Sequence, residues 1–295
     1  MYELIQVGAK TYYINCPAKM GIYKIDDTNV CLIDSGNDKD AAKKVIKILD
    51  ANNWTLEMII NTHSHADHIG GNNLLQQRTG CKIFSSGVDT AFIRYPILEP
   101  AYLYGGYPYK EIRNKFLLAQ PSAVQELTEE SLPNGMTMLR IDGHSFSMTA
   151  LKTEDEIWFL ADCLTDEKVI EKYHISFLYD VNAYLETLKM VKELPGKLFI
   201  PAHAEPAENI AELVGINQNK VYEVIEALKE ICSNPICFED LLKAVFDRYG
   251  LTMDFNQHVL VGSTIRSYLA YLKDLGEISI TFVDNKLFWS IKKKD

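Results

Sequence analysis

Hydrophobic and polar residues alternate, or run in short apolar blocks, through the first sixty positions in a way that predicts β-strands around one helix. The segments TYYIN (11–15), MGIYKI (20–25) and NVCLIDSG (29–36) are apolar or alternating and lie between turn residues, which is typical of strands. From about Asp38 to Asn52 the apolar residues recur at helical spacing. LEMII (56–60) is a continuous apolar run, which predicts a strand that is buried on both faces.

The second half of the chain shows a similar order of elements. MTMLRID (136–142), SFSMTAL (145–151) and EIWFLAD (156–162) predict strands, and a helix near 181–193 and the strand KLFI (197–200) follow them. Both halves therefore run from strands to a helix and on to a further strand. This pattern predicts a layered α/β fold made of two similar halves.

Two segments depart from that order. Residues 92–131 are dense in Tyr, Pro and Gly, and we expect a loop-rich insertion with a short helix. Near the end, a helix over 219–232 and further helical segments lead to two alternating strands around an Asp-Asn-Lys turn at 277–291. We therefore divide the chain into a main domain, residues 1–210, and a small winged-helix-like domain, residues 211–295.

Composition narrows the classes of protein that fit. Of 295 residues, 47% are hydrophobic and 24% are charged, and the net charge is −10, which suits a globular protein and disfavours broad binding to nucleic acid. The first ten residues lack the basic and apolar regions of a secretory signal, and no apolar run reaches membrane-spanning length. The cysteines form no CxxC pair. We expect free thiols, a cytoplasmic location and no membrane partner.

The strongest chemical signal is the turn THSHADH, which directly follows the predicted strand at 56–60. It places His63, His65, Asp67 and His68 within six residues. Imidazole and carboxylate groups suit zinc, iron and manganese, and four such side chains would be costly to bury without partners. A solvated polar loop is the alternative, but this single turn concentrates three of the seven histidines of the chain.

Three later residues are further ligand candidates. His144, Asp162 and His203 each follow an apolar strand, so each can project to the same rim of the sheets. Taken alone, a histidine in such a place is more often a hydrogen-bonded structural residue. Cys163 is expected to point away from Asp162 as a core thiol, because neighbouring residues of a strand face opposite sides.

Taken together, these motifs resemble those of metallo-β-lactamase superfamily hydrolases of the glyoxalase II-like and lactamase-like branch, over roughly residues 1–210. The corresponding features are Asp34, the THSHADH turn, His144, Asp162 and His203. The resemblance implies an αββα sandwich, here followed by the winged-helix-like domain. Two departures, Ala161 and Ala202 where the family has glycine, remove no ligand.

The resemblance also implies a dinuclear metal site, with Zn²⁺ as the expected ion and iron or manganese as alternatives. It assigns seven side chains: His63, His65 and His144 to one metal, Asp67, His68 and His203 to the other, and Asp162 as the bridge between them. Asp34 would orient the motif loop without binding metal. Such a site presents hydroxide to an electrophilic carbon or phosphorus, and Asp67 is the candidate catalytic residue that relays the proton.

Substrate choice is left to the surrounding loops. We expect a small thioester, ester or lactone, with endoribonuclease or phosphodiesterase activity as one alternative and a non-catalytic metal-containing sensor as another. The candidate substrate-binding residues of the insertion are Tyr102, Tyr104, Tyr107 and Tyr109, although aromatic packing explains them equally well. Acidic and basic residues nearly balance after residue 211, so that segment is expected to close the site or to form a homodimer rather than to bind nucleic acid.

Overall fold

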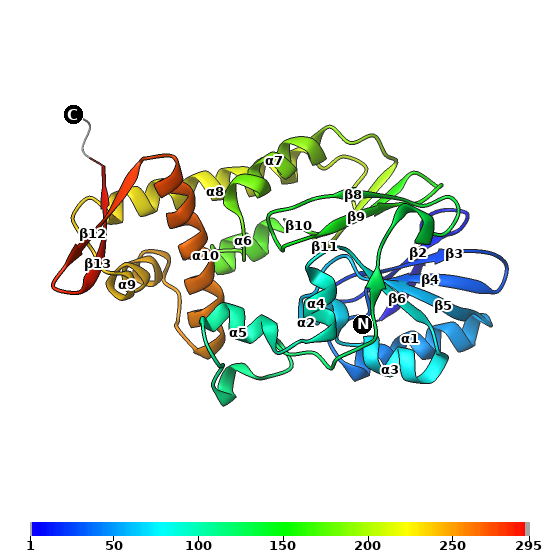
Figure 1. The fold of residues 1–295 in the computed structure, drawn as a ribbon. Coiled ribbons are helices and arrows are strands. Elements are labelled where there is room, and N and C mark those ends of the chain that lie inside the picture. The colour runs from blue at the N-terminus through cyan, green and yellow to red at the C-terminus, as the bar shows by residue number, and fades with distance from the viewer. Residues whose placement is uncertain (1, 293–295) are drawn as a thin grey trace.

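The computed structural model describes residues 2–292, which form two packed sheets with helices on their outer faces and a helical extension at one end (Figure 1). The larger sheet has seven strands in sequential order. They are β1 (Glu3–Gln6), β2 (Thr11–Asn15), β3 (Met20–Lys24), β4 (Asn29–Ile33), β5 (Thr55–Ile60), β6 (Lys82–Ser85) and β7 (Gln125–Glu126). The first four strands are antiparallel neighbours, whereas β4 to β7 run parallel.

The second sheet has four strands in the order β11-β10-β9-β8. They are β8 (Thr137–Arg140), β9 (Thr149–Lys152), β10 (Ile157–Thr165) and β11 (Leu198–His203). Only the β10–β11 pair is parallel among these strands. A hairpin of β12 (Ile278–Val283) and β13 (Lys286–Ile291) forms a separate two-stranded sheet.

The helices cover the outer faces and the extension. They are α1 (Lys39–Asn52), α2 (Ala66–Ile69), α3 (Asn72–Thr79), α4 (Asp89–Arg94), α5 (Leu98–Tyr104), α6 (Glu167–Tyr173), α7 (Val181–Lys192), α8 (Ala211–Ile231), α9 (Phe238–Tyr249) and α10 (Phe255–Asp274), with short 3-10 helices at η1 (Lys110–Ile112) and η2 (Glu129–Ser131). The α1 helix predicted from periodicity is confirmed. Asp38 caps its N-terminus by accepting hydrogen bonds from the Asp40 and Ala41 backbone N–H groups.

Alternation along the strands explains the layers. In β3, Ile22 packs on the outer face with residues of α1, while its neighbour Tyr23 packs between the sheets. In β10, Phe159 faces the first sheet and Leu160 faces the outer helices. Because of this alternation, each sheet has a hydrophobic core on its outer face, and a third core lies between the two sheets. The predicted αββα sandwich is therefore confirmed.

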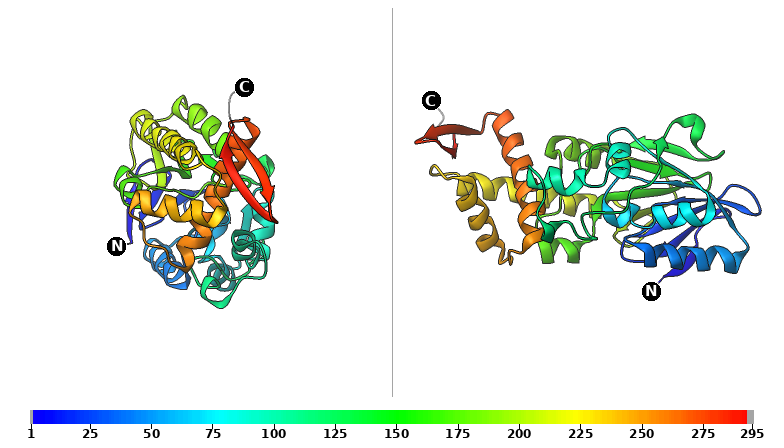
Figure 2. Two further views of the ribbon diagram at one scale, coloured as in Figure 1. Left: turned by 90° about the vertical axis from the view of Figure 1, so that its left-hand side faces the viewer. Right: turned by 60° about the horizontal axis from the view of Figure 1, so that its bottom comes forward.

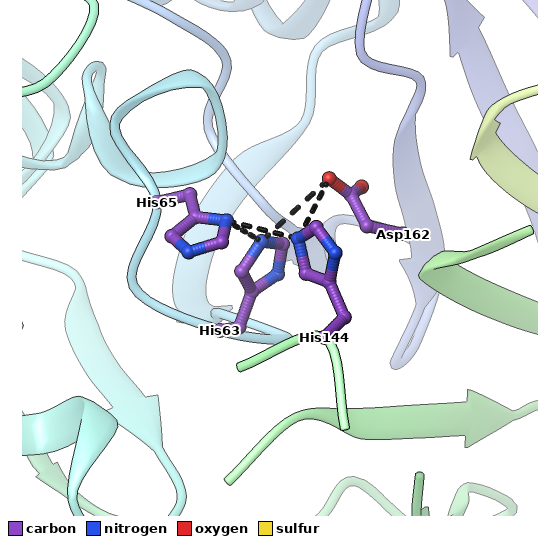
Figure 3. A group of neighbouring side chains, drawn as sticks. All are labelled: His63, His65, His144 and Asp162. Carbon is purple, nitrogen blue, oxygen red and sulfur yellow. Dashed lines mark hydrogen bonds and ion pairs between the residues drawn. The ribbon is translucent and has the colours of Figure 1, made fainter. Parts of the chain in front are cut away.

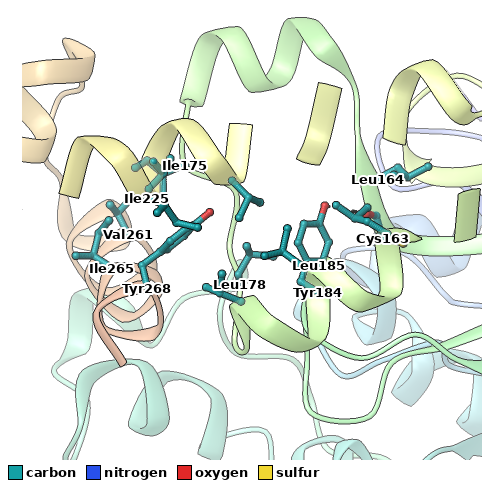
Figure 4. Packing of buried hydrophobic residues seen from close by; sticks show 14 of the residues in the cluster. Cys163, Leu164, Ile175, Leu178, Tyr184, Leu185, Ile225, Val261, Ile265 and Tyr268 are labelled. Atoms are coloured by element: carbon teal, nitrogen blue, oxygen red, sulfur yellow. Dashed lines mark hydrogen bonds between the residues drawn. The ribbon is translucent and has the colours of Figure 1, made fainter. Parts of the chain in front are cut away.

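The C-terminal part extends away from the sandwich as three helices and the β12–β13 hairpin (Figure 2). Helix α8 begins at Ala211, eight residues before the helix predicted at 219. One continuous core joins this part to the second sheet. Cys163 and Tyr184 of the sandwich belong to the same buried cluster as Ile225 and Tyr268 (Figure 4). The boundary placed at residue 210 thus crosses a shared core, and both the division into two domains and the winged-helix interpretation stay predictions.

The insertion at 92–131 is more helical than expected, since it contains the second half of α4 and all of α5, η1 and η2. It packs on the extension through a small core in which Leu103, Ile112 and Leu117 contact Val259 of α10. The insertion and α10 therefore support one another beside the sandwich. None of the helices within residues 2–292 combines the length and the apolar character needed to cross a bilayer.

Candidate metal centre

The candidate ligands gather at one rim of the sandwich, where most of them lie at or just after strand ends. The THSHADH turn follows β5 and leads into the short helix α2. His144 lies between β8 and β9, Asp162 lies within β10, and His203 ends β11. The structure thus brings together all seven side chains predicted as metal ligands. Loops at the carboxyl ends of strands are common sites for chemistry in layered α/β folds.

Backbone geometry at two positions aims these side chains. Gly143 has φ +118°, and a Cβ there would lie 2.3 Å from the Tyr184 backbone nitrogen, so only glycine fits immediately before His144. Ala161 has φ +48°, the left-handed region that costs a side-chain-bearing residue about 1–2 kcal/mol. The pairing of β10 with β11 shifts register on both sides of Ala161. This irregularity accompanies the turn of Asp162 toward the cluster.

The first donor group consists of His63, His65, His144 and Asp162 (Figure 3). His65 Nδ1 lies 3.0 Å from His63 Nε2 and 2.9 Å from His144 Nε2. Asp162 Oδ2 lies 3.8 Å from the same nitrogen of His63 and 3.3 Å from that of His144. Four donor atoms therefore face a common point.

The second donor group consists of Asp67, His68, Asp162 and His203. His203 Nε2 lies 3.2 Å from Asp67 Oδ2 and 3.3 Å from Asp162 Oδ2. His68 Nε2 lies 2.9 Å from Asp162 Oδ1. Asp162 belongs to both groups: its Oδ2 lies near His144 of the first group and His203 of the second, and its Oδ1 lies near His68.

Spacing and donor chemistry both fit divalent metal ions. Tetrahedral zinc with bonds of about 2.0–2.2 Å holds its ligand atoms roughly 3.3–3.6 Å apart. The four neighbouring pairs given above for the first group are 2.9 to 3.8 Å apart, and all four donor atoms lie within 4.8 Å of one another. The buried atoms His68 Nε2 and Asp162 Oδ1 lie 2.9 Å apart, but within residues 2–292 neither makes a hydrogen bond of acceptable geometry. Unpartnered buried polar atoms are costly, and a shared cation would satisfy both of them.

The electrostatics of the two groups differ. In the first group, burial and neighbouring imidazoles hold the pKa of His63 well below its ordinary value and lower the pKa of His65 to about 3. Both rings are therefore neutral at physiological pH, which is the form that binds metal. The lone pairs of closely spaced neutral rings repel one another unless a cation lies between them.

In the second group, negatively charged carboxylates have the larger effect on the pKa values of the histidines. Burial lowers the pKa of His203, but the charge of Asp162 and hydrogen bonds to Asp162 and Asp67 raise it on balance to about 10. The pKa of His68 is likewise raised well above its ordinary value by Asp162, Asp34 and Asp67, against the effect of burial. This pocket has a strongly negative potential that attracts positive charge, either as protons on the two histidines or as a bound cation that displaces them.

Hydrogen bonds behind the ligands fix which ring nitrogen faces the cluster. His68 Nδ1 donates to Asp34 Oδ2 at 2.8 Å. His144 Nδ1 donates to the Phe177 carbonyl at 3.0 Å, and His203 Nδ1 donates to the Pro17 carbonyl at 3.1 Å. The Nε2 atoms of these rings are then free to bind metal. Asp34 lies behind His68, the place at which a carboxylate that orients the loop without binding metal was expected.

A cavity of about 560 Å³ opens onto this cluster. Its lining includes Asp67 together with apolar side chains of the insertion and α10, namely Phe116, Leu117 and Leu260. The lining does not include the four tyrosines singled out from the sequence: Tyr102, Tyr104, Tyr107 and Tyr109. Tyr102 and Tyr109 instead pack against the small core between the insertion and α10, while Tyr104 and Tyr107 are exposed. Aromatic packing, one of the two interpretations of these tyrosines, matches this placement.

Two buried acids near the cluster were not identified from the sequence. Glu99 of α5 lines the cavity, and its Oε1 lies 3.7 Å from His65 Nε2. Burial, with the charges of Asp89 and Asp67, raises the pKa of Glu99 to about 8. Asp89 accepts hydrogen bonds from the Ser64 backbone N–H at 2.9 Å and from its hydroxyl at 2.6 Å, and thereby braces the motif turn. Neither acid lies in a local pattern that distinguishes it from a surface carboxylate.

The remaining candidates lie outside the cluster. Cys163 is fully buried among the outer-core residues, as alternation predicted, and burial with the nearby charge of Asp162 raises the pKa of its thiol to about 12. His174 stacks on Tyr249, and His258 lies 4.0 Å from Glu239. These three residues are not members of either donor group.

Comparisons with known proteins agree with this geometry. Among curated proteins, the hydroxyacylglutathione hydrolase of Methylococcus capsulatus is 42% identical over 52 residues, which are 18% of this chain and 20% of that protein. The hydroxyacylglutathione hydrolase GloC of Haemophilus influenzae is 31% identical over 80 residues, which are 27% of this chain and 36% of that protein. The chain thus matches only about a fifth to a third of the length of these relatives.

Solved structures share the fold over nearly the whole chain. A beta-lactamase domain protein from Burkholderia ambifaria superposes with a TM-score of 0.74 at 15% identity, covering 98% of this chain and 94% of that one. A metallo-beta-lactamase family protein from Thermus thermophilus gives 0.72 at 15% identity, with coverage of 99% and 98%. The family model of the metallo-beta-lactamase superfamily matches residues 16–203. With this match and the two joined His/Asp groups at the rim, the chain belongs to the metallo-beta-lactamase superfamily.

Proposed function

We propose that this protein is a dinuclear metal-dependent hydrolase that acts on a small thioester, ester or lactone. One observation carries the proposal: Asp162 is a member of both donor groups, with one oxygen near His144 and the other near His68. A carboxylate in that position suits two metal ions held side by side. Zinc is the expected ion, with iron or manganese as alternatives, because His and Asp donors bind several first-row metals.

The metals would supply one part of the chemistry and the chain the other. When bound, two divalent cations lower the pKa of water toward neutrality and polarise the carbonyl group under attack. Asp67 is the residue placed to handle the proton, since its carboxylate lines the cavity and lies 3.2 Å from His203. Burial raises the pKa of Asp67, but the charges of His68 and His203 hold it well below its ordinary value. Asp67 is therefore ionised at neutral pH and able to accept a proton and pass it to the leaving group.

The cavity and the relatives support the proposed substrate class. The volume of about 560 Å³ suits a small ligand, and Phe116, Leu117 and Leu260 suit an acyl group. The curated relatives named above hydrolyse an acylglutathione, which is a thioester. Phosphodiester or RNA cleavage and ligand sensing without turnover are the competing outcomes.

The test is product formation by zinc-loaded protein on acyl-thioesters, lactones, a chromogenic β-lactam, a phosphodiester and single-stranded RNA. We expect thioester or lactone turnover, a loss of several orders of magnitude in kcat for Asp67→Asn, and loss of activity with reduced metal content for His63→Ala. His258→Ala is the matched control, because His258 lies outside both donor groups. Turnover of RNA alone, or two bound metals without turnover of any substrate, would contradict the proposal.

A further inference from the structure

A second cavity, of about 720 Å³, adjoins the same cluster. His144, Asp162 and His203 line both this cavity and the smaller one that faces the insertion. The donor groups therefore lie between two chambers. A substrate whose scissile bond lies at the cluster extends its acyl part into one chamber and its leaving group into the other.

The second chamber is lined by a lysine whose side chain is mostly covered and has no close ionic partner. Lys19 lines it, and the Lys19 side chain is only 7% exposed. Within the described residues, the one carboxylate within ion-pair distance of Lys19 Nζ is that of Glu205, at 4.0 Å. The Glu205 side chain is 81% exposed, so this contact contributes little.

The backbone holds Lys19 next to the cluster. The Lys19 N–H donates to the Ala202 carbonyl at 3.0 Å, one residue before the candidate ligand His203. Two residues earlier, the Pro17 carbonyl accepts the hydrogen bond from His203 Nδ1 at 3.1 Å. Two hydrogen bonds thus tie the segment 17–19 to the end of β11, and the position of Lys19 is fixed relative to His203.

The other charged groups of the chamber do not neutralise Lys19. Asp166 also lines it, but its carboxylate caps α6 by accepting a hydrogen bond from the Lys168 backbone N–H at 3.0 Å. Lys168 lines the chamber too, with an exposed side chain that adds positive charge at the mouth. Lys19 Nζ makes no hydrogen bond within the described residues, so it can donate a charge-assisted hydrogen bond to an anionic ligand group in the chamber.

We infer that Lys19 recognises an anionic group, a carboxylate or a phosphate, on the leaving-group side of the substrate. The inference rests on the proposed function and deepens it, because it adds a charge requirement to the substrate class. The chamber beside Phe116 and Leu117 takes the acyl part, and the chamber beside Lys19 takes the charged thiol or alcohol part. Lys19 is a specificity residue rather than a catalytic one.

The test uses zinc-loaded full-length protein and three thioesters with the same acetyl group. The probes are S-acetyl-3-mercaptopropanoate, its neutral amide and 2-(acetylthio)ethyl phosphate. We expect KM for the better anionic probe to be about tenfold below that for the amide, which is the effect of one hydrogen bond to a charged group. In Lys19→Gln that KM should rise to the value for the amide, while kcat and the KM for the amide stay unchanged. Whether the carboxylate or the phosphate shows the larger Lys19-dependent preference identifies the anion.

Three further variants test whether the charge preference depends on Lys19. Lys168→Gln is the matched control, an exposed lysine of the same chamber, and should retain most of the preference. Lys19→Arg should restore it, and Glu205→Gln, an exposed change that removes the competing carboxylate, should lower KM for the anionic probes. An equal KM for charged and neutral probes in the unaltered protein, or a preference that persists in Lys19→Gln, overturns the inference even if turnover is normal.

A binding measurement separates this inference from the proposed function. Calorimetry with 3-(ethylthio)propanoate and its amide, which cannot be hydrolysed, reports the charge preference in the absence of turnover. If none of the three thioesters is turned over but the carboxylate analogue binds more tightly than the amide in a Lys19-dependent way, the anion site is supported and the thioesterase activity is contradicted. If thioesters are turned over but the two analogues bind equally, the activity stands and the anion site fails.

Discussion

Asp34 Oδ2 lies 2.8 Å from His68 Nδ1, and both side chains are almost completely buried. The same carboxylate accepts hydrogen bonds from the backbone N–H and the hydroxyl of Thr62, each at 2.8 Å. Asp34 therefore fixes the orientation of His68 and the start of the motif turn at once. It leaves His68 Nε2 directed at the second donor group.

Asp34→Ala should weaken metal binding about 10- to 100-fold, because losing the group that orients a ligand typically costs that much. It should also lower the free energy of unfolding by about 1–3 kcal/mol, since the buried Thr62 N–H loses its acceptor. Titration against a chromophoric chelator measures the affinity, and urea unfolding of the metal-free protein measures the stability. Unchanged metal affinity in a folded Asp34→Ala protein would rule out the orienting role.

Asp162→Ala should reduce bound metal more than His65→Ala does. Asp162 belongs to both donor groups, whereas His65 belongs only to the first. We expect two zinc ions per chain in the unaltered protein, at least one in His65→Ala and fewer than one in Asp162→Ala, counted by elemental analysis after gel filtration. Equal metal content in the two variants would show that Asp162 does not bridge the groups.

Removing metal should lower the melting temperature, and adding zinc should raise it with concentration, because a ligand that binds only the folded chain stabilises it. The closest ring nitrogens of His63, His65 and His144 lie about 3 Å apart. Without a metal ion, the repulsion between their lone pairs is not offset. Differential scanning calorimetry with and without a chelator measures the shift. Asp162→Ala is the control: both donor groups lose a ligand in this variant, so its melting temperature should respond weakly to zinc.

Gly143→Ala and Ala161→Gly should have different effects on the stability of the protein, although both residues have positive φ angles. Gly143→Ala should destabilise the protein by roughly 3 kcal/mol or more, since its Cβ would overlap the Tyr184 backbone. Ala161→Gly relieves a left-handed conformation at φ +48°, but glycine gains entropy in the unfolded chain. We expect its free energy of unfolding to stay within about 1 kcal/mol of the original, as measured by urea denaturation. A similar loss of stability in both variants would contradict the conformational argument.

Local patterns in the sequence predicted the parts of this fold that depend on short-range chemistry. Strand periodicity placed β2 to β5, and the motif turn supplied His63, His65, Asp67 and His68. Strand β1 was missed, because its four residues lie at the sheet edge and are at most half-buried, which weakens the hydrophobic signal.

The features that depend on tertiary packing were not predictable in the same way. Glu99 reaches the cavity only because the insertion packs on α10, and no local spacing connects it with His65. The tyrosines of the insertion lie away from the cavity for the same reason, since that packing directs Phe116 and Leu117 there instead. Helix α8 begins early at Ala211, where the preceding residue, Ile210, makes no side-chain cap that would mark the start.

Asp155 should make stability depend on pH through a contact remote from the metal centre. Its carboxylate joins the two sheets at their turns, accepting hydrogen bonds from Thr11 Oγ1 at 2.7 Å and from the Lys10 and Ala9 backbone N–H groups at 2.9 and 3.1 Å. Burial raises the pKa of Asp155, but these hydrogen bonds outweigh it and lower the pKa below the ordinary value. A lowered folded-state pKa gives stability that is present above about pH 4, the unfolded value, and is lost as the pH falls through the folded one.

Asp155→Asn should therefore cost about 1 kcal/mol at pH 7, a figure kept small because the side chain is partly exposed. The difference between the two proteins should shrink as the pH falls below about 4, the unfolded-state pKa, and on through the lower folded-state pKa. Urea unfolding of the chelated proteins across this range isolates the effect, since the titrating histidines and the other carboxylates are common to both. Asp27→Asn, a change at an exposed carboxylate, is the control and should leave the curve unaltered. A constant difference between Asp155→Asn and the original from pH 7 to pH 3 would show that hydrogen bonds to the charged carboxylate do not stabilise this junction.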